Sequence, residues 1–521
     1  AFVKVFESWK TAYPDALTSN LEKNQELKSV LLEETPWVIE AKNETQQKHA
    51  VSKLFNANNI RHQQELALAK LAKLQLGNGG YRWFDGMPDS RYVTQQILTG
   101  FGRLFERQVI RENDFEGLSN GIKRALEYTD ERMLEDYNRW LELKAKNQQN
   151  EGSYYDVQYL YARSLYLNNY PIAPKYVEAH KHYLKLALKN WQNDGLYHQA
   201  MLAIAFKRYH EETTALLIMK SLAEKALHNE EMGMYWRQQA GWYWYQAPIE
   251  TQAQLIEAFA EVAQDTKAVD EMKKWLLKQK QTQAWATTTA TAEAVYALML
   301  QGSNLLAENK PVEIYAKNQA IGPDSKSAVE PGTGYFKKTW NSADIPQGMD
   351  QPLVKNPNNH IAWGAVYLQY FEDYDKVKPA TSPLNLEKKL FVERQTPSGP
   401  ALEPIEKAQD LHPGDKIVVR IVLRTDRNME FVHMKDLRAS GFEPIDVLSG
   451  YHYRDGLGYY QSTRDAATHF FFNYLPKGTW VFEYALRVFQ KGSYNNGFTQ
   501  IECMYAPEFS ARSQSEYVKV K

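Results

Sequence analysis

Apolar residues recur at helical spacing from the start of the chain to about Gly302. This spacing predicts a series of amphipathic helices. Glycine and asparagine, which can end a helix in a left-handed conformation, lie between the apolar stripes at 77–80 and 193–195. Two of the clearest stripes are Tyr176, His180, Tyr183, Leu184, Ala187, Leu188 and Trp191, and Ala215, Met219, Leu222 and Ala226.

Roughly twelve helices joined by short loops fit this pattern. Helix pairs with one apolar face bury that face by stacking into an open solenoid or by closing into an α/α toroid. No fixed sequence period is evident, which favours the toroid. We therefore predict an α/α toroid over residues 1–305.

The pattern becomes alternating beyond Gly302. Residues 312–316 alternate, and glycine and proline separate the short segments that follow, which predicts a small β module over residues 306–382. Turn sequences then precede runs of strand-forming residues, which predicts a β-sandwich over residues 383–521. The expected strands are 390–392, 416–423, 469–474, 479–488 and 498–505. The fold class is thus multidomain, α then β.

Length and charge narrow the class of protein. At 521 residues the chain exceeds the usual size of a single hydrophobic core, which agrees with several domains. Lys and Arg number 62 against 63 Asp and Glu, so the basic surface that nucleic-acid binding requires is absent. No apolar run is long enough for a membrane-spanning helix. We expect neither a nucleic-acid partner nor a membrane-spanning segment.

Clusters of aromatic residues are the candidate interface residues. Trp83 and Phe84 follow a glycine-rich loop, and Trp236, Trp242 and Trp244 lie close together. Such rings could stack on a sugar, but aromatic side chains that cap helix ends or pack against a neighbouring domain are the more common arrangement. We interpret both groups as packing residues and candidate interfaces.

No conventional catalytic signature is evident. The sequence contains no nucleophile elbow, phosphate-binding loop or His-Glu-x-x-His motif, and its one cysteine, Cys503, rules out a cysteine-based zinc site. We expect no catalytic, cofactor-binding or metal-binding residue. The alternative is a polysaccharide lyase or glycoside hydrolase, because these enzymes also combine an α/α toroid with β-sandwiches. Asp85, Asp89 and Asp156 fall near predicted helix ends beside aromatic residues, as a sugar cleft would require.

Several motifs make the chain similar to one family. They are 20–28 (NLEKNQELK), 32–37 (LEETPW), 79–84 (GGYRWF), 89–95 (DSRYVTQ), 285–294 (WATTTATAEA) and 504–509 (MYAPEF). With them, the order of toroid, β module and sandwich resembles the C-terminal part of the alpha-2-macroglobulin and complement family, especially its bacterial members of the Bacteroidetes type. The likeness spans nearly the whole chain.

The resemblance implies a thioester-type toroid, a CUB-like β module and a macroglobulin-type sandwich that corresponds to the receptor-binding domain of animal relatives. Such proteins trap proteases: a bait segment is cut, the molecule rearranges, and the protease is held. We expect a non-enzymatic C-terminal fragment of such an endopeptidase inhibitor, in the periplasm or at the cell surface, with a lipid anchor on the parent as an option. Its partners would be proteases and upstream macroglobulin domains. A non-inhibitory envelope scaffold is a further alternative.

The Cys-x-Glu-Gln motif of a thioester is absent, because Cys503 is followed by Met504 and Tyr505. Either the motif lies upstream of residue 1 in a longer protein, which we favour, or the parent is of the thioester-less kind. Family sandwiches present aromatic and methionine side chains that shield the thioester pocket from water. The resemblance therefore implies an interface role for Met504 and Tyr505.

Overall fold

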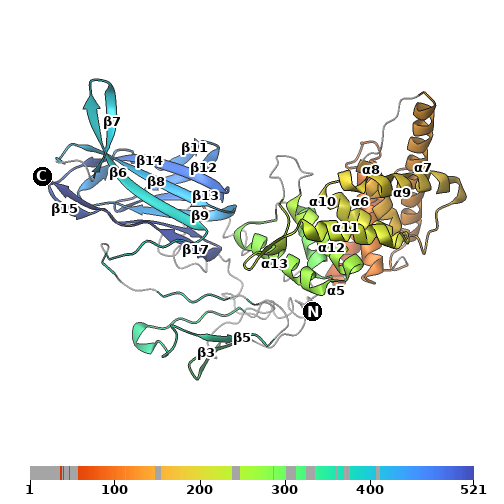
Figure 1. The fold of residues 1–521 in the computed structure, drawn as a ribbon, viewed down its shortest axis with the longest axis horizontal. Coiled ribbons are helices and arrows are strands. Elements are labelled where there is room, and N and C mark those ends of the chain that lie inside the picture. Colours follow the sequence, from red (N-terminus) through yellow and green to blue (C-terminus); the bar gives the residue numbers. More distant parts are fainter. Residues whose placement is uncertain are drawn as a thin grey trace.

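The chain forms a helical region followed by β-sheets, which confirms the predicted order (Figure 1). The computed structural model describes residues 36–37, 39, 46, 57–111, 113–146, 154–237, 247–285, 287–300, 312–323, 335–357, 362, 364–368, 372–373, 376–405 and 411–521. None of the helices described there is both long and apolar enough to cross a lipid bilayer.

Ten α-helices are described in the first part of the chain. They are α5 (Ala57–Leu74), α6 (Arg91–Glu106), α7 (Leu118–Ala145), α8 (Tyr154–Ser164), α9 (Val177–Asn190), α10 (Leu196–Arg208), α11 (Glu212–Glu224), α12 (Pro248–Ala258), α13 (Thr266–Thr282) and α14 (Thr288–Leu298). A hairpin of β1 (Leu227–Asn229) and β2 (Gly233–Tyr235) precedes α12, and the π-helix η5 (Phe259–Ala263) extends it. Short 3₁₀ turns, η3 (Pro174–Tyr176) and η4 (Trp191–Asn193), flank α9.

The helices form the inner and outer layers of a ring. The inner helices α6, α8, α10, α12 and α14 each contact the next inner helix along the chain. The outer helices α7, α9, α11 and α13 pack against α6, α8, α10 and α12 in turn. An ion pair between Arg103 on α6 and Glu293 on α14 joins the first inner helix to the last. The helices therefore close into the predicted α/α toroid instead of continuing as an open solenoid.

Two of the inner helices, α10 and α12, are buried on almost every side. All residues of α10 from Gln199 to Phe206 are buried, as are nearly all of those in α12. Close approach of α6 to α8 depends on Gly102, where an added β-carbon would lie 2.7 Å from the Cβ of Leu165. Glycine is therefore the residue that lets these two inner helices pack at this distance.

A small three-stranded sheet follows the ring, in the order β4-β3-β5. Its strands are β3 (Glu313–Ala316), β4 (Gln319–Ile321) and β5 (Leu353–Lys355), and both pairings are antiparallel. A 3₁₀ turn, η6 (Ser342–Asp344), precedes β5. The sheet falls inside the range predicted for the small β module, whose limits and CUB-like assignment stay predictions.

The last part of the chain contains thirteen strands. They are β6 (Leu384–Thr396), β7 (Gly399–Pro404), β8 (Lys416–Thr425), β9 (Met429–Leu437), β10 (Phe442–Pro444), β11 (Gly450–Arg454), β12 (Leu457–Thr463), β13 (Ala467–Leu475), β14 (Gly478–Val488), β15 (Gly492–Asn495), β16 (Thr499–Cys503), β17 (Ala506–Arg512) and β18 (Tyr517–Val520). Four of the expected strands lie within β6, β8, β13 and β14, and the fifth overlaps β16.

Two antiparallel sheets form the sandwich. One has the strand order β10-β14-β8-β6-β7 and the other β11-β12-β13-β9-β16-β17. Side chains of β6 alternate between buried and more exposed positions, with the buried ones in the core. One inward residue is charged: Nζ of the fully buried Lys388 on β6 lies 2.8 Å from Oδ1 of Asp436 on β9. This buried ion pair ties the two sheets together.

The ring and the sandwich meet where α13 approaches β17 (Figure 1). The side chain of Gln281, near the end of α13, donates a hydrogen bond to Glu508 on β17. Helix α13 of the ring and the edge strand β17 of the sandwich are therefore in direct contact, although more than two hundred residues separate them in sequence.

Candidate functional site

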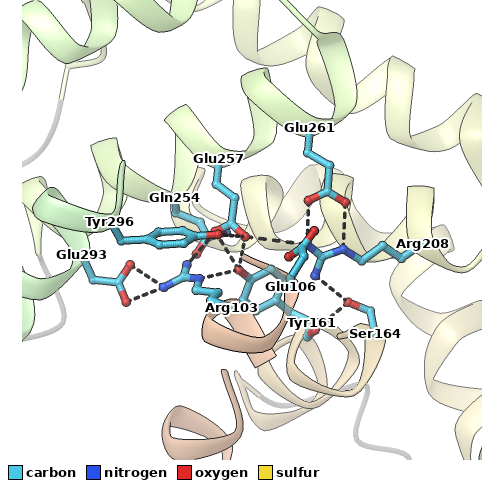
Figure 2. A network of polar contacts seen from close by, with 10 residues as sticks. All are labelled: Arg103, Glu106, Tyr161, Ser164, Arg208, Gln254, Glu257, Glu261, Glu293 and Tyr296. Atoms are coloured by element: carbon cyan, nitrogen blue, oxygen red, sulfur yellow. Dashed lines mark hydrogen bonds and ion pairs between the residues drawn. The ribbon is translucent and has the colours of Figure 1, made fainter. Parts of the chain in front are cut away.

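Polar side chains from the inner helices meet on the axis of the ring (Figure 2). Arg103 of α6 is their centre. Its guanidinium donates to both oxygens of Glu293 at 2.7 Å, to Oε2 of Glu257 at 2.6 Å and to Oε1 of Gln254 at 3.0 Å. Its Nε donates to the Tyr161 hydroxyl on α8 at 3.1 Å. The axial network comprises Arg103, Glu106, Tyr161, Ser164, Arg208, Gln254, Glu257, Glu261, Glu293 and Tyr296.

A second guanidinium, that of Arg208 at the end of α10, completes the network. It donates to the two oxygens of Glu261 at 2.8 and 2.6 Å, and to Glu106 at 3.2 Å. Its Nη2 also lies 3.9 Å from Oε1 of Glu257. Because Arg103 and Arg208 both reach Glu257, this carboxylate connects the two halves of the network.

Glu257 is held as a permanent charge at the centre of the ring. Burial opposes its ionisation, but Arg103 and Arg208 outweigh burial and hold the pKa of Glu257 below its usual value. Burial likewise disfavours the charge on Arg103, whereas Glu257 and Glu293 raise the pKa of Arg103 well above its ordinary value. Burial raises the pKa of Tyr161, whose hydroxyl donates to Glu257 at 2.7 Å. The arrangement suits a structural clamp and not a general acid or base.

The sequence of α12 carries a signal for this network. Glu250, Gln254, Glu257 and Glu261 are spaced at i, i+4, i+7 and i+11, which places them along one face of the helix. The helix buries side chains on its other faces as well. A polar stripe on a helix that is buried all round indicates internal polar contacts, since buried charges are paired in folded proteins. This stripe was not predicted, because the helices were inferred from the spacing of their apolar positions.

The predicted candidates Trp83 and Phe84 lie beside the start of α6. Trp83 is 51% exposed and stacks on Tyr92 with ring centroids 5.8 Å apart, and Phe84 is 69% exposed. Burial raises the pKa of Tyr92, and the nearby carboxylates of Glu250 and Glu293 raise it further. Both candidates are thus exposed beside the start of α6, and Tyr92, on which Trp83 stacks, lies near the carboxylates of Glu250 and Glu293. Their interface role stays a prediction.

Trp37, which precedes α5 in the chain, is fully buried against the sandwich. Its ring contacts Phe431 and Phe471 edge-on, with centroids 5.5 and 5.2 Å away. Its Nε1 donates to Oδ1 of Asn473 at 2.7 Å. A buried tryptophan with a satisfied N–H is typical of an interface hot spot. We call the residues around it the Trp37 socket: Phe431, Tyr460, Phe471, Asn473, Met504 and Tyr505.

The predicted candidates Met504 and Tyr505 belong to this socket. Met504 is buried, and Tyr505 is partly buried with its ring 5.1 Å from that of Phe431. The two side chains therefore lie where the N-terminal part of the chain meets the sandwich. Their shielding of a thioester region stays a prediction.

Polar contacts form a second part of the interface between ring and sandwich. The guanidinium of Arg427 donates to both oxygens of Glu231, in the β1–β2 hairpin, at 2.8 and 3.2 Å. Oε2 of Glu430 accepts from the backbone N–H of Ala284, between α13 and α14, at 2.9 Å. The ring residues thus come from the two connections that lead into α12 and α14. Because these side chains are partly exposed, each contact contributes little free energy by itself.

A buried histidine pair lies behind the socket. Nε2 of His433 and Nδ1 of His469 are 2.9 Å apart, and the His433 ring stacks on Phe471 with centroids 4.8 Å apart. Burial lowers the pKa of His469 to about 4 and that of His433 well below its usual value, and the nearby Lys435 acts in the same direction. Both rings are therefore neutral at pH 7.

We expect His469→Gln to reduce the pH dependence of stability. An unfolded histidine takes up its proton near pH 6.5, whereas His469 in the folded chain does so only near pH 4. Between these values the unfolded state binds more protons, so the free energy of unfolding falls as the pH falls. Burial of His469 accounts for a loss of roughly 2 kcal/mol between pH 7 and pH 5, which urea denaturation can measure.

His469→Gln should lack this part of the fall in the free energy of unfolding between pH 7 and pH 5. The matched control is His412→Gln, because His412 is an exposed residue of the same sandwich. His412→Gln should keep the full fall in the free energy of unfolding between pH 7 and pH 5. Equal losses in wild type and His469→Gln would show that His469 is not held neutral.

Three other predicted candidates are tryptophans. Trp236 lies in the core of the ring, not at an interface between domains. It is buried, its Nε1 donates to the carbonyl of Leu222 at 2.8 Å, and its ring lies 5.8 Å from that of Phe259. The helices of the toroid bury the Trp236 side chain, which is therefore unavailable to a sugar or a neighbouring module. Trp242 and Trp244 lie outside the described residues.

The single thiol is not activated. Cys503 is buried in β16, and burial raises the pKa of its thiol to about 12. Thiolate is the reactive form of cysteine, so this residue is inert at neutral pH. Among the described residues, no group of three or more His, Cys, Asp or Glu is arranged to hold a metal ion.

The three aspartates of the alternative enzyme hypothesis differ in exposure and in hydrogen-bond partners. Asp85 is largely exposed, and Asp89 accepts hydrogen bonds from Tyr128 at 2.5 Å and from Arg132 at 3.1 Å. Asp156 is buried in the first turn of α8. No hydrogen bond or ion pair between described residues joins any two of these aspartates.

Comparison with known proteins identifies part of the chain. Residues 384–508 match the family model of the bacterial alpha-2-macroglobulin MG10 domain. Trypsin-activated alpha-2-macroglobulin from Escherichia coli is 13% identical, covering 89% of this chain and 30% of its own, with a TM-score of 0.44. The elastase-activated form is 15% identical, covering 88% of this chain and 38% of its own, with a TM-score of 0.39. Circularly permutated Ras protein 2 of Dictyostelium discoideum is 21% identical over 41% of this chain and 6% of its own length.

Proposed function

We propose that this chain, which carries the MG10 domain of the bacterial alpha-2-macroglobulin family at residues 384–508, is the C-terminal part of a protease trap. The match of the sandwich to that domain carries the proposal. The chain spans 30% of the length of the E. coli protein, so trapping would be an activity of a longer molecule. We expect that molecule to work outside the cytoplasm, in the periplasm or at the cell surface, with no catalytic step in this part.

The contact between ring and sandwich is the joint that we expect to open in the trap. It consists of partly exposed polar contacts such as that of Arg427 with Glu231, and Trp37, which precedes α5 in the chain, adds one apolar anchor on the sandwich. In such an interface the buried aromatic anchor supplies most of the binding free energy. Withdrawal of Trp37 from its socket would therefore release the whole contact. Cleavage of a bait segment elsewhere in the molecule would be the trigger.

The axial network would keep the ring rigid during this movement. Its ten residues all belong to the ring, and their hydrogen bonds join inner helices to one another. Separation of the ring from the sandwich breaks none of these bonds. The ring can therefore move as one body, as in hinge motions between domains.

Protease trapping can be tested on the full-length molecule with trypsin and porcine elastase, the proteases that activated the E. coli proteins named above. A trap encloses the protease and leaves its active site open. We expect hydrolysis of a large protein substrate to fall at least about tenfold while hydrolysis of a small chromogenic peptide is retained, a difference of at least 1.4 kcal/mol in apparent barrier. The 521-residue chain alone should change neither rate.

Two outcomes would reject the proposal. Loss of both activities would indicate an inhibitor that blocks the protease active site. Retention of both would favour a non-inhibitory envelope scaffold.

A further inference from the structure

The sandwich has four edge strands, and three of them are protected. β10 is only three residues long and ends at Pro444, and β7 contains Pro400 and Pro404. The edge of β17 is closed by Ala380, which exchanges backbone hydrogen bonds with Arg512 at 3.1 and 2.8 Å. Short length, proline and coverage are the devices by which natural sheets prevent pairing with a further strand.

The fourth edge, β11, is five residues long and ends at Arg454, but it has neither proline nor a covering segment among the described residues. It pairs with β12 along its whole length, and in the part of the chain that the structure describes no strand pairs with its other side. Its sequence contains neither proline nor lysine. Tyr451 and Tyr453 on this strand are 71% and 80% exposed, and Val447 and Leu448 just before it are also exposed. An unprotected, apolar edge of this kind is a ready site for strand addition.

The exposed tyrosines continue the aromatic band that holds Trp37. The ring of Tyr451 lies 5.0 Å from that of Tyr460, and Tyr460 lies 6.3 Å from Phe471, which contacts Trp37. Both ends of this band therefore lie on one face of the six-stranded sheet. One end is occupied by Trp37, and the other end, at β11, is open to solvent.

We propose that β11 accepts a β-strand from another β-domain of the same polypeptide, extending the six-stranded sheet by one strand. The inference rests on the proposed function, which supplies the longer molecule. Main-chain hydrogen bonds to residues 450–454 would provide affinity. Apolar side chains of the added strand would cover Tyr451 and Tyr453, which project from the same face because they are two residues apart.

The small size of the edge favours a partner on the same chain. A stable complex between separate proteins buries about 800 Å² per partner, which a five-residue strand does not approach. A strand tethered on the same polypeptide needs less area, because the linker gives it an effective concentration on the order of millimolar. A second copy of this chain is therefore the weaker choice of occupant.

Hydrogen exchange measured by mass spectrometry on residues 450–454 tests the proposal. We expect the backbone amides of this segment to exchange at least about tenfold more slowly in the full-length molecule than in the 521-residue chain. In the full-length molecule, Tyr453→Lys should abolish this protection, because it puts a charge in place of the ring that apolar side chains of the added strand would cover. Tyr517→Lys is the matched control, since Tyr517 is a similarly exposed tyrosine on β18. It should leave the protection unchanged.

Two results would overturn the proposal. Equally fast exchange of residues 450–454 in both proteins would mean that no strand is added. Protection in the 521-residue chain that rises with its concentration would identify a second copy as the occupant. Exchange in β13 serves as an internal check that Tyr453→Lys folds. A working trap with an unprotected β11 would reject only this inference, whereas a protected β11 in a molecule that traps no protease would reject only the proposed function.

Discussion

Replacement of Arg103 by methionine should lower the free energy of unfolding of the ring by about 3–5 kcal/mol. The change removes a guanidinium that bridges Glu257 and Glu293, and leaves Glu257 buried with Arg208, 3.9 Å away, as its remaining cationic partner. For a domain of this size, each kcal/mol corresponds to roughly 2–4 °C in Tm. The loss of helical circular dichroism on heating or in urea measures both quantities.

Arg107→Met is the matched control for this prediction. Arg107 lies one turn after Arg103 in sequence, but its side chain is exposed. We expect its replacement to change stability by less than about 0.5 kcal/mol, as at most surface positions. If Arg103→Met were as mild as Arg107→Met, the axial network would not be what closes the ring.

Trp37→Ala should release the N-terminal part of the chain from the sandwich. The change removes a fully buried indole from a socket of aromatic side chains, which costs about 3–5 kcal/mol at comparable buried sites. Met504, buried beneath Trp37, would become accessible to oxidants. We expect its conversion to the sulfoxide by dilute peroxide to accelerate at least about tenfold. Mass spectrometry of the peptide that contains Met504 measures this rate.

Two controls separate loss of the anchor from general unfolding. Met434 lies in the sandwich core, so its oxidation should stay slow in the variant. Arg427→Ala removes a partly exposed ion pair of the same interface and should accelerate oxidation of Met504 only slightly. If Arg427→Ala had the larger effect, the polar contacts and not Trp37 would hold the interface together.

The order of helices and strands could be predicted from the sequence because it depends on local periodicity. The stripe that ends at Trp191 corresponds to α9, and alternation beyond Lys416 corresponds to β8. Closure of the helices into a ring was predicted over an open solenoid because the sequence shows no fixed period. The family resemblance, which rested on motifs such as 504–509, is confirmed by the match of residues 384–508 to the MG10 domain.

The candidate site was less accessible because its contacts are not local. Arg103 meets Glu257 and Glu293 only after the ring closes, more than 150 residues along the chain. Trp37 and Asn473 are 436 residues apart in sequence, so no periodicity links them. From the sequence, the aromatic cluster that includes Trp236 could belong to the surface or to the core. The packing of Trp236 with residues of α12 and η5 shows that it belongs to the core.

Charged residues at core-facing positions are the second reason why some contacts could not be predicted from the sequence. The alternation of β6 predicts that Lys388 points inward, where lysine is rarely found. Its partner Asp436 is on a different sheet, and sequence gives no indication of that pairing. The same holds for the polar stripe of α12. In both cases the position of a polar residue in an apolar pattern was visible, whereas its partner was not.

We expect the contact at Trp37 to open when the full-length molecule is cut by a protease. Oxidation of Met504 by dilute peroxide, before and after limited cleavage by trypsin, tests it directly. We predict slow oxidation in the intact molecule and at least about tenfold faster oxidation after cleavage, with Met434 protected throughout. An unchanged rate at Met504 in molecules that have been cut and have captured the protease would contradict the account.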